Sequence, residues 1–92
     1  MGGAELDAIY EIEMDLPGET LIYREPTRGR HSSVICTFGG RPILSPRTLG
    51  DWWYPAERRR EAMDDGTRAA LIARIAAHAR GRLGLSGLEI EE

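Results

Sequence analysis

The first half of the chain alternates between apolar and polar positions, with the period of two that is typical of β-strands. In Leu6–Asp15 every even-numbered residue is apolar, and the odd-numbered residues are mostly acidic. Thr20–Glu25 continues the alternation after Leu16–Glu19, where Pro17 fixes φ and Gly18 tolerates a positive φ. We therefore predict two strands, Leu6–Asp15 and Thr20–Glu25, joined by a turn.

One antiparallel register of these two strands satisfies both of their faces. Apolar residues meet on one face, and an acidic residue meets an arginine on the other. This register sets Met14 opposite Leu21, Ile12 opposite Tyr23, and Glu11 opposite Arg24.

A second hairpin is predicted after a loop over Pro26–Ser32. Its strands are Ser33–Phe38 and Arg41–Leu44, and Gly39-Gly40 is a suitable two-residue connection because both glycines tolerate positive φ. Pro42 cannot donate to a strand ladder, so we expect its strand at an edge of the sheet. Both faces of this hairpin are apolar, so we expect another element to cover the second face. The predicted register sets Phe38 opposite Arg41, Cys36 opposite Ile43, and Ile35 opposite Leu44.

Helical signals begin at Ser45-Pro46, an N-cap followed by a proline at the first helical position, which predicts a short turn of helix ending at Gly50. A long helix then begins at a cap formed by Asp64 or Asp65 and runs to about Arg82, with Gly84 just beyond its end. Its apolar residues recur at helical spacing. They are Leu71, Ile72, Ile75, Ala76, Ala79 and Leu83.

These elements predict a two-layer α+β fold in which the main helix packs on one face of a four-stranded antiparallel meander. Leu88–Glu91 alternates again and is either a short fifth strand or a frayed tail. We expect residues 1–92 to form one small domain.

The segment between the strands and the long helix is the most distinctive part of the sequence. Asp51–Arg60 contains both tryptophans and the densest run of arginines, and Pro55 favours an extended Tyr54. The pattern of Ala56–Met63 leaves open a frayed helical turn or a loop. Adjacent residues in extended backbone point to opposite sides, so we expect one tryptophan to cover the second face of the Ser33–Leu44 hairpin and the other to be available to a partner.

Aromatic residues and arginines are enriched at protein interfaces, so this segment predicts a binding surface. We expect a non-enzymatic interaction module that binds a protein partner or its own copy through Trp52–Arg60. The candidate contact residues are Trp52, Trp53, Tyr54, Arg58 and Arg59.

Charge leaves a second hypothesis open. A net charge of −3 gives no general attraction to nucleic acid. All twelve cationic residues are arginines, and the chain contains neither asparagine nor glutamine. We attribute this composition to the codon bias of a GC-rich genome, which we expect to be bacterial. A weak RNA-binding or single-stranded nucleic-acid-binding surface could still combine the aromatic residues with basic loops. Its residues would be Arg28, Arg30, Arg41 and Arg58–Arg60.

The reactive side chains suggest no catalytic or metal site. Cys36 is the single cysteine, and His31 and His78 do not occur at metal-ligand spacing. No glycine-rich phosphate loop is present, so we expect neither a cofactor nor an enzyme. No secretion signal or apolar run long enough for a membrane helix is evident, and we expect a cytoplasmic protein.

Overall fold

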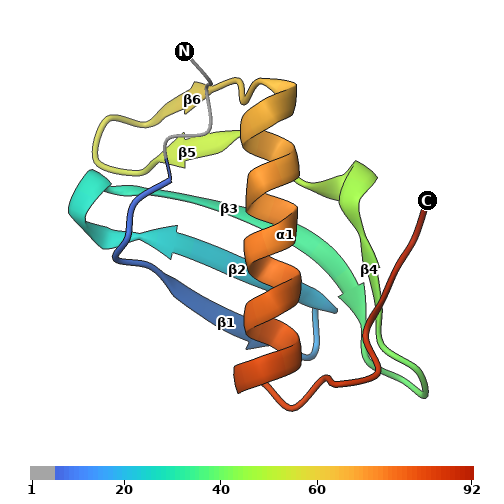
Figure 1. The fold of residues 1–92 in the computed structure, drawn as a ribbon. Coiled ribbons are helices and arrows are strands. Elements are labelled where there is room, and N and C mark those ends of the chain that lie inside the picture. The colour runs from blue at the N-terminus through green and yellow to red at the C-terminus, as the bar shows by residue number, and fades with distance from the viewer. Residues whose placement is uncertain (1–5) are drawn as a thin grey trace.

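A computed structural model describes residues 6–92 and shows an α+β fold in which one long helix crosses one face of a mostly antiparallel sheet (Figure 1). The sheet has seven strands, whereas four were predicted with a possible fifth at the C-terminal end. The strands are β1 (Glu11–Asp15), β2 (Thr20–Glu25), β3 (Arg30–Thr37), β4 (Ile43–Ser45), β5 (Trp52–Tyr54), β6 (Arg59–Glu61) and β7 (Glu89–Ile90). The helices are the short 3-10 helices η1 (Pro26–Arg28) and η2 (Pro46–Thr48) and the long helix α1 (Asp65–Arg82). The strand order is β1-β2-β3-β4-β7. Near its N-terminal end β3 also pairs with β5, and β5 pairs in turn with β6.

The predicted register of the first hairpin is confirmed, with Met14 opposite Leu21 and Ile12 opposite Tyr23. The predicted start of β1 at Leu6 is wrong, because the strand begins at Glu11. Before it, the amide of Asp7 donates to the Glu25 carboxylate at 2.8 Å. A side-chain acceptor therefore replaces the strand ladder in this segment.

Two details of the first hairpin also differ from the prediction. The ion pair on its polar face joins Arg24 to Glu13, at 2.7 Å, rather than to Glu11, which lies directly opposite. A long arginine side chain reaches a diagonal neighbour as easily as a direct one. In the turn, Glu19 rather than Gly18 has the positive φ, at 51°.

The register predicted for the second hairpin is wrong by one residue. Cys36 lies opposite Leu44 rather than Ile43, because the connection is longer than Gly39-Gly40, with Gly40 at a φ of 78°. A shift by one residue moves every side chain of a strand to the other face. Leu44 is consequently the residue that β4 contributes to the core. In addition, β3 begins at Arg30, inside the segment predicted to be a loop.

β4 is not an edge strand, contrary to the prediction, because β7 pairs with it in parallel. Pro42 lies just before β4, and its carbonyl accepts a hydrogen bond from the amide of Glu89 at 3.0 Å. The alternation at the end of the chain therefore marks a fifth strand of this path, the first of the two alternatives predicted.

The long helix begins and ends as predicted. Asp64 is its N-cap, with a side chain that accepts a hydrogen bond from the amide of Thr67 at 2.7 Å, and Gly84 follows its end at a φ of 75°. The predicted apolar stripe faces the sheet, where Leu71 and Ile75 are completely buried. η2 is also as predicted, except that Ser45 forms no side-chain capping bond and Leu49, not Gly50, ends it.

The core lies between α1 and the sheet. Its buried residues come from β2, β3, β4, β5, α1 and the adjoining loops. They are Leu21, Tyr23, Val34, Cys36, Leu44, Leu49, Trp52, Met63, Leu71, Ile75, Ala76, Ala79 and Leu88.

Candidate functional site

The segment that the sequence singled out forms a β-hairpin. Trp52–Tyr54 is β5, Arg59–Glu61 is β6, and the turn between them has Arg58 at a φ of 50°. Neither a helical turn nor a loop, the two alternatives left open for Ala56–Met63, describes β6. The hairpin joins the rest of the sheet through the pairing of Trp53 with His31 on β3, and it lies at the opposite end of the sheet from the β3–β4 turn (Figure 1).

Trp52 belongs to the core. Its side chain is 3% exposed, its ring lies 6.0 Å from that of Tyr23, and the guanidinium of Arg30 stacks 3.8 Å from its centroid. A residue with this exposure offers no surface to a partner, so Trp52 leaves the set of candidate contacts. The prediction that a tryptophan covers the second face of the Ser33–Leu44 hairpin is also wrong for Trp52, which packs on the same side as α1 with Leu71 and the rest of the core.

Trp53 faces the other side of the sheet, as alternation along β5 requires. It is partly exposed, lies opposite His31 and has the Arg60 guanidinium 5.9 Å from its ring centroid. A hollow of about 390 Å³ lies next to Trp53, between the part of β3 that pairs with β5 and the part that pairs with β4. Its polar lining includes Ser33 and Asp51. Trp53 is therefore the tryptophan of β5 that remains partly open to solvent.

Tyr54 and Arg59 hold the hairpin together on the α1 side. The Tyr54 hydroxyl donates to Glu61 at 2.7 Å and accepts from Arg30 at 3.3 Å. Arg59 stacks 4.1 Å from the Tyr54 ring and pairs with Glu57 at 2.7 Å. These contacts order two candidate residues, whereas the third, Arg58, is exposed at the turn.

The face of the sheet opposite α1, which we call the open face, is covered by no helix or strand among residues 6–92. Directly paired residues in a sheet share a face, so the pairings define rows of neighbouring side chains. Ile22 and Ser33 form part of one row, and Ile35, which is 42% exposed, belongs to another. The row that crosses the widest part of the sheet contains Glu11, Arg24, His31, Trp53 and Arg60.

Charge is distributed unevenly along the open face. β1 presents the exposed Glu11 and Glu13, and β6 at the far end of the row presents the exposed Arg60. Between these ends, burial and then the nearby Arg24 lower the pKa of His31 below its usual value, so that the imidazole is neutral at neutral pH. An apolar and aromatic centre thus lies between an acidic end and a basic end.

The basic residues proposed for nucleic-acid binding do not form one continuous patch, since Arg28 and Arg30 line one hollow and Arg60 lines another. Arg30 is buried in an ion pair with Glu25 at 2.7 Å, and Arg41 pairs with Glu89 at 2.9 Å. Arg41 lies in the connection between β3 and β4, and Arg58 lies in the turn between β5 and β6. These two connections are at opposite ends of the sheet (Figure 1). The structure therefore does not bring the predicted set together.

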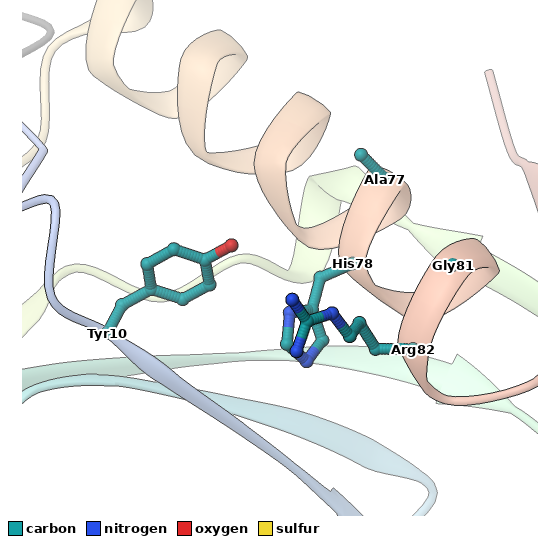
Figure 2. A pocket seen from close by; sticks show the side chains of 5 residues that line it. All are labelled: Tyr10, Ala77, His78, Gly81 and Arg82. Atoms are coloured by element: carbon teal, nitrogen blue, oxygen red, sulfur yellow. The ribbon is translucent and has the colours of Figure 1, made fainter.

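The remaining reactive groups show no catalytic arrangement among the described residues. Cys36 is completely buried, and its burial raises the pKa of the thiol, which makes it a poor nucleophile. A hollow of about 500 Å³ beside α1 is lined by Tyr10, His78 and Arg82 (Figure 2). Burial and then Arg82 lower the pKa of His78, and no carboxylate of residues 6–92 lines this hollow to orient the imidazole as a base.

Among residues 6–92, no three histidine, cysteine, aspartate or glutamate side chains are placed to hold a metal ion. α1 is not apolar enough to cross a membrane, and no other helix in this range is.

Comparison with known proteins gave no match to a family model, to a curated protein or to a solved structure.

Proposed function

We propose that this protein is a non-enzymatic interaction module that binds a protein partner through the open face and the adjoining β5–β6 hairpin. One observation carries the proposal, namely that β5 divides its two tryptophans between the two sides of the sheet. Trp52 is part of the core, whereas Trp53 is partly exposed beside Arg60. We further propose that the protein acts in the cytoplasm.

The surroundings of Trp53 support this proposal. Protein interfaces combine aromatic and arginine side chains with an apolar centre and a polar rim. Trp53 and the exposed Ile35 supply apolar area, Arg60 and Arg58 supply guanidinium groups, and Glu13 lies at the opposite rim. Tyr54 and Arg59, which are already ordered by their own contacts, support the hairpin and limit the entropy lost on binding.

Site-specific photo-crosslinking tests the location of the surface. A photoreactive amino acid at Ser33 lies on the open face, and the matched control is the same amino acid at Ala73, which is exposed on α1. In cells, protein adducts are expected from position 33 and not from position 73. Equal adducts from both positions, or none from position 33, would contradict the proposal.

A second candidate function, binding of single-stranded nucleic acid, is favoured by the hollow beside Trp53. His31 and Arg60 line it together with the aromatic ring, a combination that suits base stacking beside a phosphate. The burial of Arg30 and the pairing of Arg41 reduce the basic surface that this function needs.

Fluorescence anisotropy with labelled RNA and single-stranded DNA distinguishes the two functions. Binding to nucleic acid would be strong at low salt, would weaken steeply as salt rises, and would be lost in Trp53→Ala. We expect no saturable binding. Salt-sensitive binding that depends on Trp53 would replace the protein-interaction proposal by this second function.

A further inference from the structure

The longest row of the open face is complementary to its own reverse. From β1 to β6 it contains an acidic residue, a cation, a histidine, an aromatic residue and a cation. When the row is reversed and laid on itself, the acid faces the terminal arginine, the inner arginine faces the tryptophan, and the histidine faces itself. In order, its residues are Glu11, Arg24, His31, Trp53 and Arg60.

We propose that the partner of the open face is a second copy of this chain, bound face to face about a two-fold axis that runs along β3. This inference rests on the proposed function, since it names the partner of the same surface. An axis that is parallel to the sheet and lies midway between the two copies turns their open faces toward each other and exchanges the acidic and basic ends. Such an interface is isologous and closes as a dimer.

The exchange places opposite charges together at both ends of the interface. Glu11 and Arg60 are exposed, and neither forms an ion pair within residues 6–92. In the dimer, Glu11 of each copy meets Arg60 of the other, which gives two equivalent ion pairs. A single surface pair contributes little, but two pairs at fixed ends of one interface determine its orientation.

The inner positions of the row are also complementary. Arg24 of each copy meets Trp53 of the other, and an arginine over an indole face is a favourable cation–π contact. Arg24 can make this contact and retain its ion pair with Glu13, because the guanidinium face stacks while its edge donates.

The centre of the interface is apolar. On the axis, β3 of one copy lies over β3 of the other, so Ile35 of the two copies meet, and Ser33 offers no bulk to prevent close approach. Two sheets that pack face to face in this aligned manner lie about 10 Å apart. The dimer is thus a four-layer arrangement of helix, sheet, sheet and helix.

Sedimentation equilibrium of the full chain, from low micromolar to near-millimolar concentration, tests the proposal. Wild type is expected to reach a dimer and no larger species. Ile35→Arg brings two like charges together at the axis, and dimerisation should be lost. Ala73→Glu, which adds a charge on the opposite side of the molecule, should leave the dimerisation constant unchanged.

A charge exchange tests the orientation. Glu11→Arg and Arg60→Glu should each weaken dimerisation about tenfold, because each places like charges together at two symmetric positions. Combining the two substitutions restores opposite charges, so the double variant should dimerise more tightly than either single variant. Circular dichroism confirms that each variant is folded, since all of the substituted side chains are exposed.

The outcomes separate this inference from the proposed function. A wild type that is monomeric throughout, a dimer indifferent to Ile35→Arg, or a double variant no tighter than the single variants would overturn the two-fold dimer. In each of these cases, crosslinking from position 33 to a different protein would still support the interaction module. Loss of the crosslinks as well would remove both.

Discussion

Two ion pairs on neighbouring residues of β2 show how differently the two faces of one sheet are used. On the α1 side, Glu25 pairs with Arg30, and their side chains are 0% and 9% exposed. On the open face, Arg24 pairs with Glu13, and their side chains are 40% and 59% exposed. Both contacts measure 2.7 Å. The distance is the same, so burial determines what each pair contributes.

The buried pair belongs to a larger network. The Glu25 carboxylate also accepts from the Tyr23 hydroxyl at 2.6 Å and from the amide of Asp7 at 2.8 Å. Burial and then this carboxylate raise the pKa of Tyr23 above its usual value, which keeps the phenol protonated as a donor. Arg74 of α1 donates to the Tyr23 hydroxyl at 3.0 Å and to the carbonyl of Asp7.

This network joins the segment before β1 to the sheet and to α1. Burial opposes the charge of Arg30, but its hydrogen bonds to Tyr54 and Glu25 outweigh that effect and raise its pKa. A buried charge is tolerated only when it is paired and hydrogen-bonded, as here. The polar groups on the α1 side are therefore paired and buried within the fold, whereas those on the open face remain exposed to solvent.

The largest expected effect comes from breaking the buried pair. Glu25→Ala removes the carboxylate that balances the buried charge of Arg30 and should destabilise the fold by about 3–5 kcal/mol. Glu13→Ala is the matched control on the open face and should cost about 0–1 kcal/mol. Urea unfolding followed by circular dichroism measures both. Equal losses of unfolding free energy in Glu25→Ala and Glu13→Ala would contradict the contrast between the two faces.

Truncating isoleucines on the two sides sharpens the comparison for apolar groups. Ile75→Ala removes a completely buried side chain of α1 and should cost about 2–5 kcal/mol, since it leaves a cavity. Ile35→Ala on the open face should change the stability of the monomer by about 0.5 kcal/mol or less. The same unfolding experiment, at concentrations below dimerisation, distinguishes them. A wild-type curve for Ile75→Ala would refute the packing of α1 on the sheet.

The exposed pair gives a smaller effect with a specific signature. Arg24→Ala should cost the monomer about 0–1 kcal/mol in low salt, and the difference from wild type should shrink as salt rises because the pair is open to solvent. Glu25→Ala should show almost the same penalty in low and high salt, because its partner is buried. A salt-independent cost of Arg24→Ala would place that pair among the buried interactions.

The smallest effect is that of pH. The pKa of both His31 and His78 is lowered from 6.5, mainly by burial, so the unfolded chain binds protons before the folded one does. The contribution of these two histidines to the free energy of unfolding should be fully present above pH 6.5, and it should decrease as the pH falls below 6.5. Asp64, whose pKa is lowered from 3.8 by its hydrogen bonds to Thr67, contributes to a separate loss in stronger acid.

Unfolding curves on either side of pH 6.5 measure the histidine contribution. The variants His31→Gln and His78→Gln should each flatten the pH dependence in this range. Stability that increases toward lower pH would reverse the sign expected for histidines that are partly buried as neutral groups.

The sequence predicted the elements that local pattern determines. The alternation of Met14 with polar neighbours determines the register of the first hairpin, and the spacing of Leu71 and Ile75 determines the buried side of α1. In the second hairpin both faces are apolar, so the pattern could not choose between Ile43 and Leu44 as the partner of Cys36.

The candidate site was predictable in part. The sequence singled out Asp51–Arg60 as an unusual segment, but the arginines of β6 have no apolar pattern, and only pairing with β5 makes them a strand. The side that each tryptophan faces depends on how β5 joins β3, which is a tertiary contact. The buried Glu25 did leave a signal, since it continues the alternation of Leu21 and Tyr23 on the apolar face.

Acrylamide quenching of two single-tryptophan variants tests most directly whether the sheet has one closed face and one binding face. Trp53→Phe retains Trp52, which should be shielded from the quencher at every protein concentration. Trp52→Phe retains Trp53, which should be quenched in dilute solution and become shielded as the protein associates. Equal shielding of both tryptophans in dilute solution, or stronger quenching of Trp52, would contradict the account.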